Sequence, residues 1–89
     1  MKIVLSGNLK RFTDFESEVE LDADTILSAL DQLVERFPSI KAVIYDGQHK
    51  LRGVHRLYIN GEVLSASEIA TRQLEPGDEV GVLTALAGG

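Results

Sequence analysis

The stretch F-E-S-E-V-E-L-D-A-D-T-I-L-S-A-L-D-Q-L-V-E-R-F-P, residues 15–38, decides the fold because its hydrophobic periodicity changes midway. Residues 15–21 alternate between a mostly apolar face and an acidic face, which is the period-two pattern of a strand. Beyond Asp24 the apolar residues recur at helical spacing until Pro38, which cannot continue a helix. The side predicted to be buried holds Ile26, Leu27, Leu30, Leu33, Val34 and Phe37. The stretch therefore predicts a strand and then an amphipathic helix, capped by Asp24 or Thr25.

The residues before this stretch predict a second strand. Lys2–Ser6 is rich in β-branched and apolar residues, and Gly7-Asn8 interrupts it. We expect it to pair with the strand at residues 15–21 through a long loop that Leu9 and Phe12 pin to the core. The acidic face of that second strand is typical of a sheet edge, where charge discourages pairing with another chain.

The residues after Pro38 predict a short helix and three more strands. The helix is expected at Ser39–Tyr45, with Ile40, Val43 and Ile44 inward, and residues 47–54 read as a polar loop. The predicted strands are His55–Ile59, Glu62–Leu64 and Glu79–Thr84. The first two are joined by Asn60-Gly61, a strong two-residue hairpin signal, and the last follows a Pro-Gly turn. The stretch Ser65–Leu74 is expected to be irregular or a single helical turn.

This order of elements predicts an α+β fold. The sheet is expected to have about five strands, with the main helix packed across one face and the second short helix beside it. Residues 1–84 would form the single domain, and residues 85–89 a flexible C-terminal tail that ends in Gly-Gly.

The composition restricts the classes of function. The chain has 89 residues, and fourteen acidic residues against nine basic ones give a net charge of −5. Nucleic acids and anionic membranes attract basic surfaces, so we expect neither as a partner. The absence of cysteine excludes disulfides, thiol catalysis and zinc–thiolate sites. With no visible signal peptide, these features lead us to expect a cytoplasmic protein.

The remaining polar residues do not suggest an active site. His49 and His55 are the only histidines, and we expect both to be solvent-exposed rather than to bind a metal. Asp22 and Asp24 suit the start of a helix better than a calcium loop, which needs a glycine at its sixth position. No acid–base pair or nucleophile motif stands out, so we expect that the chain is not an enzyme by itself.

The C-terminal part carries the most specific signal. Its residues are the Asn60-Gly61 hairpin, the Glu75-Pro76-Gly77-Asp78-Glu79-Val80 turn into the last strand, and the terminal Leu86-Ala87-Gly88-Gly89. With the order of elements, they resemble the β-grasp of ubiquitin and, more closely, the sulfur-carrier family typified by MoaD and ThiS. The Leu51-Arg52 pair, which precedes the strand predicted at His55–Ile59, also resembles the longer members of this family. Thr84-Ala85 stands where many molybdopterin-synthase small subunits have Pro-Pro.

The resemblance implies a reaction cycle centred on the C-terminus. An ATP-dependent, E1-like enzyme would adenylate the Gly89 carboxylate, and sulfur would replace AMP to give a thiocarboxylate. A sulfur-accepting synthase subunit or enzyme would then take the sulfur, and the carrier itself would hold no cofactor. Gly88 would let the tail enter the active site of a partner enzyme, because a residue without Cβ can enter a narrow channel. Leu86 and Ala87 would contact the partner.

A second set of partner-binding residues is predicted on the sheet. The core face is expected to hold Ile3, Leu5, Leu57, Ile59, Val80 and Val82. Because side chains alternate along a strand, Val4, Arg56, Tyr58 and Leu83 would share the other face. An apolar patch with an Arg and a Tyr is a plausible docking surface.

Two other functions remain open. The same activated tail could be attacked by a lysine amine, which would make the chain a ubiquitin-like protein modifier. Alternatively, it could be a non-catalytic interaction domain in which Gly89 is dispensable. Within the carrier hypothesis, molybdopterin, thiamin, cysteine and other metabolites all remain open as the destination of the sulfur.

Overall fold

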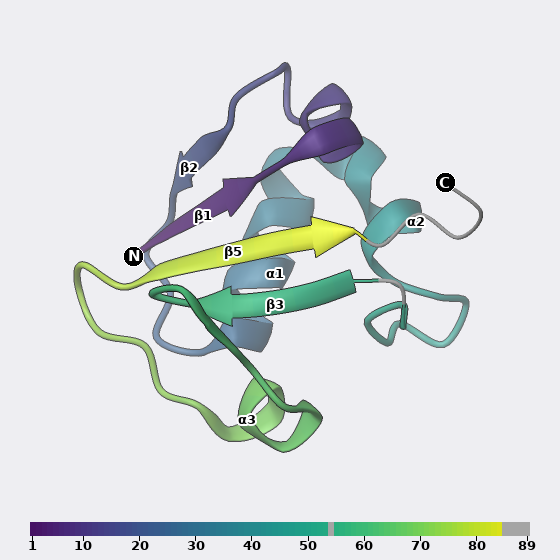
Figure 1. Cartoon of the computed structure of the whole chain (residues 1–89). Helices are drawn as coiled ribbons and strands as arrows, with labels where there is room; N and C mark the ends of the chain where they lie inside the picture. The colour runs from purple at the N-terminus through teal and green to yellow at the C-terminus, as the bar shows by residue number, and fades with distance from the viewer. Residues whose placement is uncertain (54, 85–89) are drawn as a thin grey trace.

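The computed structural model describes residues 1–53 and 55–84, which form one mixed sheet with helices packed against it (Figure 1). The strands are β1 (Lys2–Leu5), β2 (Glu18–Glu20), β3 (His55–Ile59), β4 (Glu62–Val63) and β5 (Glu79–Thr84). The α-helices are α1 (Ile26–Arg36), α2 (Lys41–Ile44) and α3 (Ala66–Thr71). The segments Gly7–Phe12 and Pro38–Ile40 are 3₁₀ helices.

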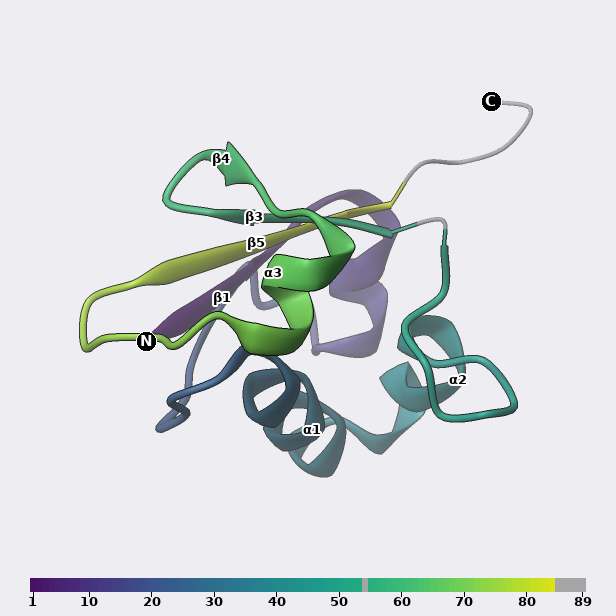
Figure 2. The same ribbon diagram turned by 90° about the horizontal axis from the view of Figure 1, so that it is seen from below.

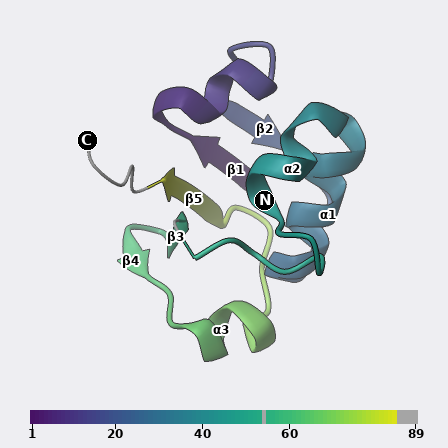
Figure 3. The ribbon, with the colours of Figure 1, turned by 90° about the vertical axis from the view of Figure 1, so that its right-hand side faces the viewer.

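The sheet has the order β2-β1-β5-β3-β4. Strands β1 and β5 are parallel, and the other neighbouring pairs are antiparallel. Helix α1 crosses one face, which Figure 2 shows below the strands. Figure 3 shows α1 and α2 on the same side, with α3 near the end of the sheet formed by β3 and β4. The predicted β-grasp, with five strands, a main helix and a second short helix, is therefore confirmed.

The core lies between α1 and the sheet. All six strand residues predicted to face inward are buried: Ile3, Leu5, Leu57, Ile59, Val80 and Val82. They pack against Ile26, Ala29, Leu30 and Leu33 of α1. Leu27 was expected on this face, but it is 47% exposed. Each helical residue turns by about 100°, so Leu27 lies on the flank of the helix and the smaller Ala29 takes the inner position.

Thr25, one of the two residues predicted to cap α1, is its N-cap. The Thr25 hydroxyl accepts a hydrogen bond of 3.1 Å from the Ser28 amide. Asp24 has a different role: its carbonyl accepts a 2.7 Å bond from the Leu74 amide. The segment between α3 and β5 is thereby tied to the entrance of α1. Within the described part of the chain, no helix is both long enough and apolar enough to cross a membrane.

The strand predicted at residues 15–21 is shorter than expected. β2 begins only at Glu18 because a turn occupies the preceding residues. Thr13 is fully buried, and its hydroxyl donates a 2.9 Å hydrogen bond to the Glu16 carbonyl. Asp14 and Phe15 take left-handed backbone conformations, with φ of 54° and 63°, and Phe15 is 76% exposed. The alternating pattern of residues 15–21 predicted too long a strand, because the buried Thr13 closes a turn within the first part of that stretch. As predicted, β2 is an edge strand.

The stretch Ser65–Leu74, expected to be irregular or one turn, contains the helix α3. Ser65 and Glu68 form a capping box in which each side chain accepts a hydrogen bond from the other residue's backbone amide. The sequence S-A-S-E carries the S-x-x-E signature of this cap. The helix predicted at Ser39–Tyr45 is present as a 3₁₀ turn and α2, with Ile40 and Ile44 buried and Val43 half-buried.

Hydrogen bonds fasten the beginning of β5 to the β3–β4 hairpin. Asn60 and Gly61 have φ of 48° and 89°, as a type I′ turn requires. The Asn60 side chain donates to the Asp78 carboxylate (3.1 Å) and accepts from the Glu79 amide (3.0 Å). The other Asp78 oxygen accepts from the Glu75 amide (2.8 Å). The Glu75 amide and then the Asn60 side chain hold the pKa of Asp78 below its usual value.

We expect the Asp78 carboxylate to make the free energy of unfolding depend on pH. A depressed folded pKa means that Asp78 stabilises the fold above its unfolded pKa of about 3.9 and ceases to do so as pH falls through the folded value. The variant Asp78→Asn should therefore be less stable than wild type at neutral pH, with the difference shrinking in acid. Urea unfolding across this pH range measures it. Glu35→Gln on α1 is the control, and an equal pH dependence in wild type and Asp78→Asn would contradict the expectation.

Candidate functional site

The candidate site combines the C-terminal tail with the sheet surface beside it. Leu86, Ala87, Gly88 and Gly89, and the predicted tail 85–89 as a whole, lie outside the described residues. The strand that leads to them is described. β5 is the middle strand of five, bonded to β1 on one side and β3 on the other. The chain therefore leaves the centre of the sheet, held by both neighbours as far as Val82 and, among the described strands, by β3 alone at Leu83 and Thr84.

The register brings the four predicted face residues to one side of the sheet. Val4 and Tyr58 both pair with Gly81, and Arg56 pairs with Leu83. Val4 and Tyr58 are half-buried, whereas Leu83 is 46% exposed. Residues paired across neighbouring strands point to the same face, so the predicted grouping is confirmed. Their role in binding a partner stays a prediction.

A shallow hollow of about 230 Å³ opens on this face around Gly81. The residues that line it are Val4, Ser6, Tyr58, Gly61, Glu79, Gly81, Val82 and Leu83. Gly81 carries no side chain between Val4 and Tyr58, and this leaves the space open. A Cβ added there would meet the Tyr58 Cβ at 3.8 Å, an ordinary contact, so the fold itself does not require glycine.

Sequence reasoning missed Gly81. The available signal was a glycine inside an otherwise β-branched and apolar strand, E-V-G-V-L-T at residues 79–84. Glycine in a strand interior often marks a place where another molecule approaches the backbone closely. Gly81 therefore joins the candidate docking residues.

Charged groups occupy the far end of the same face. The Lys2 ammonium lies 2.8 Å from Glu18 and 3.5 Å from Glu79. The hydrogen bond to Glu18, more than any other contact, raises the pKa of Lys2 above its usual value. These exposed pairs contribute little to stability. Leu83 lies at the opposite end of β5, next to the point where the tail begins.

Arg56 is on this face but does not line the hollow. Its guanidinium donates hydrogen bonds to the carbonyls of Gly53 (2.9 Å) and His55 (3.2 Å). The positive charge is thereby held near the start of β3, beside the position of β5 from which the tail departs.

The two histidines differ from each other. His49 is exposed, as predicted, and its ring stacks on Tyr45 with centroids 4.1 Å apart. His55 was expected to be exposed, but it is only 5% accessible, and its Nε2 donates a 2.7 Å bond to the Val43 carbonyl. The strand alternation turns His55 inward beside Leu57. Across residues 1–53 and 55–84, no group of three His, Asp or Glu side chains could hold a metal ion.

Comparisons with known structures identify the same fold. The small archaeal modifier protein 1 of Methanosarcina acetivorans superimposes with a TM-score of 0.87 at 26% identity, covering 99% of this chain and 94% of that one. A chain of the BexX/CysO complex of Amycolatopsis orientalis gives 0.79 at 26%, covering 99% and 98%. CysO of Mycobacterium tuberculosis gives 0.81 at 22%, covering 96% and 98%, a likeness of fold alone.

The comparison with protein-family models agrees with the structural comparisons. No match was found among curated protein sequences. Residues 3–89 match the ThiS family, a span that contains every strand and helix described above except the first residue of β1. As the resemblance to MoaD and ThiS predicted, this chain belongs to the ThiS family.

Proposed function

We propose that this protein is a sulfur carrier whose C-terminal Gly89 carboxylate is adenylated and then converted to a thiocarboxylate. The observation that carries the proposal is that the ThiS family match continues to residue 89 and so includes Gly88-Gly89. The carboxylate needs activation because it is ionised at neutral pH, with a pKa of about 3.5, and is then a poor electrophile.

The chemistry requires a partner at each step. A Gly89 oxygen attacks the α-phosphate of ATP in an E1-like enzyme, and pyrophosphate leaves. Hydrosulfide delivered by the sulfur donor then attacks the carbonyl carbon and AMP leaves, which gives the thiocarboxylate. On a sulfur-accepting enzyme the sulfur passes to the acceptor, and water supplies the oxygen that restores the Gly89 carboxylate. In this scheme the carrier contributes the carboxyl group and the surface that docks it.

The sheet face beside the tail is the proposed docking surface. Leu83 is half-exposed and the hollow around Gly81 is mostly apolar, which suits a desolvated protein contact. Five extended residues beyond Thr84 reach at most roughly 17 Å, so docking on this face would let Gly89 enter a partner's active site. The complex of BexX with CysO supports a protein partner for a chain of this fold.

A second candidate function is protein modification. The similarity to the small archaeal modifier protein 1, with a TM-score of 0.87, favours it. Both functions share adenylation and differ in the nucleophile that follows: sulfur gives a thiocarboxylate, whereas a lysine amine gives an isopeptide bond. A test that detects both products therefore separates them.

We expect the purified protein to gain mass when incubated with an E1-like activating enzyme, ATP, Mg²⁺ and a sulfur donor. The gain should correspond to one oxygen replaced by sulfur and should map to the C-terminal peptide. Because oxidation of Met1 adds nearly the same mass, fragmentation of that peptide assigns the change. The matched controls are a chain without Gly89 and a chain with one alanine added after it.

Loading of either control variant would contradict the role of the Gly89 carboxylate. Heavier conjugates that carry a Gly89–lysine linkage, without thiocarboxylate, would replace the carrier proposal with the modifier function. If the native chain forms no adenylate with a panel of activating enzymes, the interaction-domain reading gains support.

We expect Gly81→Val to weaken docking without disturbing the fold. The valine would fill the hollow between Val4 and Tyr58, while its Cβ makes only an ordinary contact with Tyr58. Adenylation kinetics should show an increase in KM for the carrier of about tenfold, equivalent to about 1.4 kcal/mol of binding.

Gly47→Val is the matched control, because a Cβ at Gly47 meets nothing within 4 Å and the position lies outside the hollow. Thermal unfolding establishes that both variants keep the fold. Unchanged KM in a folded Gly81→Val protein would show that partners do not use the hollow.

A further inference from the structure

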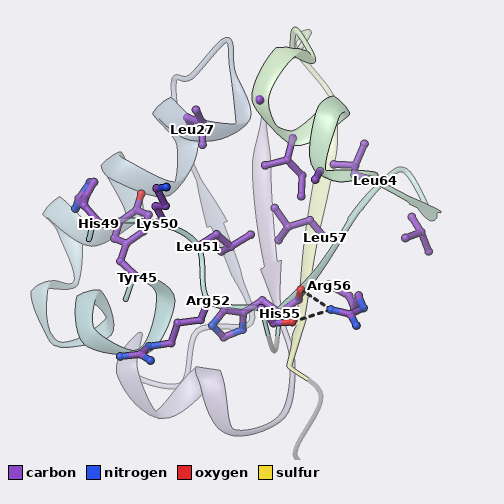
Figure 4. A pocket seen from close by; sticks show the side chains of 15 residues that line it. Leu27, Tyr45, His49, Lys50, Leu51, Arg52, His55, Arg56, Leu57 and Leu64 are labelled. Carbon is purple, nitrogen blue, oxygen red and sulfur yellow. Dashed lines mark hydrogen bonds between the residues drawn. The ribbon is translucent and has the colours of Figure 1, made fainter. Parts of the chain in front are cut away.

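A larger groove lies on the helix side of the sheet, away from the proposed docking face. It has a volume of about 750 Å³ and runs between α1, α3, β3 and the loop before β3. Figure 4 shows Leu51, Leu57 and Leu64 in its middle, with Leu27 above them. Leu27 and Val63, at its rims, are 47% and 59% exposed. Apolar side chains thus form both the floor and the borders.

Lys and Arg residues, without Asp or Glu, line the described part of this groove, although the protein as a whole is acidic. Of the described residues, those that line it include Lys50, Arg52 and Arg56 but none of the fourteen acidic residues. None of these three cations forms an ion pair with a described carboxylate within 4.0 Å. The Asp46 carboxylate accepts hydrogen bonds from the Lys50 and Gln48 amides, and it interacts electrostatically with Arg52 and Lys50. Arg52 and Arg56 donate to backbone carbonyls, which fix their charges at one end of the groove. Lys50 and Arg52 thus bring positive charge to an apolar surface, whereas Arg56, which also borders the groove, belongs by strand alternation to the opposite face of the sheet.

The groove and the hollow around Gly81 face opposite ways. They share strand β3, on which Leu57 points into the groove and Tyr58 into the hollow. Successive side chains on a strand point to opposite faces of the sheet. A molecule in the groove would therefore leave the hollow accessible to another partner.

We propose that this groove binds an acidic amphipathic helix of a second protein. Aliphatic side chains on one face of that helix would cover Leu27, Leu51 and Ile69, and its carboxylates would meet Lys50 and Arg52. The exposed rims favour this occupant over a small molecule, because Leu27 and Val63 remain open to a surface that spans the groove. The net charge of −5 requires the attraction to be local, so the binding should weaken as salt is added.

The test is a titration of the isotope-labelled full chain with three synthetic peptides, followed by NMR of the backbone amides. The first peptide has leucines at i, i+3, i+4 and i+7 with glutamates between them. The second has lysines in place of the glutamates, and the third has serines in place of the leucines. We expect saturable binding of the first peptide only, with the largest shifts at Leu51, Leu57, Leu64 and Ile69.

Matched variants locate the contact. Leu27→Ala should weaken binding of the acidic peptide roughly fivefold, whereas Leu83→Ala, equally exposed on the other face, should leave it unchanged. Arg52→Glu should weaken it about fivefold at low salt, and Arg11→Glu, an exposed arginine away from the groove, should not. Thermal unfolding identifies any variant that has lost the fold. If Arg52→Glu is unfolded, Lys50→Glu takes its place in the test.

Three results would overturn the proposal: equal binding of the acidic and lysine peptides, shifts confined to the Val4 and Tyr58 face, or no binding of the acidic peptide. Binding of decanoate without binding of the peptide would also overturn it and would make the groove a small-molecule site. A chain that ends at Thr84 should bind the acidic peptide as well as the full chain does. The outcome is therefore independent of whether Gly89 is ever loaded with sulfur.

Discussion

The packing of α1 against the inward face of β1, β5 and β3 is the contact on which the rest of the structure depends. Ile26, Leu30 and Leu33 are wholly buried against strand residues that alternate inward and outward. Once this helix covers one face, each strand residue is committed to the core or to the surface. The outward positions then bring Val4, Tyr58 and Leu83 together, although they are far apart in the sequence. The proposed docking face is thus a consequence of how the core is built.

The periodicity of the sequence was sufficient for the strands and for α1, because alternation and helical spacing record which side chains are buried. It failed where a single side chain overrides the local pattern. The buried hydroxyl of Thr13 closes a turn inside a stretch that still alternates, so β2 is shorter than predicted. The capping box of Ser65 and Glu68 starts a helix in a segment with weak amphipathicity, and its signature was overlooked.

The candidate site was predicted only where it follows the same periodicity. Val4, Arg56, Tyr58 and Leu83 were placed on one face correctly, since the alternation of three strands determines it. Gly81 was missed because its contribution is empty space, which depends on the neighbours that pair with it. The groove near α3 could not be foreseen either. Its walls come from four separate segments, and its basic character is apparent only when Lys50 and Arg52 are seen beside the apolar residues of the other segments.

The central position of β5 also has a mechanical consequence. A partner that draws on the end of the chain in the direction of β5 pulls along the axis of that strand. That strand is hydrogen-bonded to β1 and β3 along both edges, and its first residues are fastened to the β3–β4 hairpin by Asn60 and Asp78. A pull in this direction shears two ladders at once instead of opening the bonds one after another. The strand that carries the tail is therefore the one best placed to resist extraction when a partner draws on that tail.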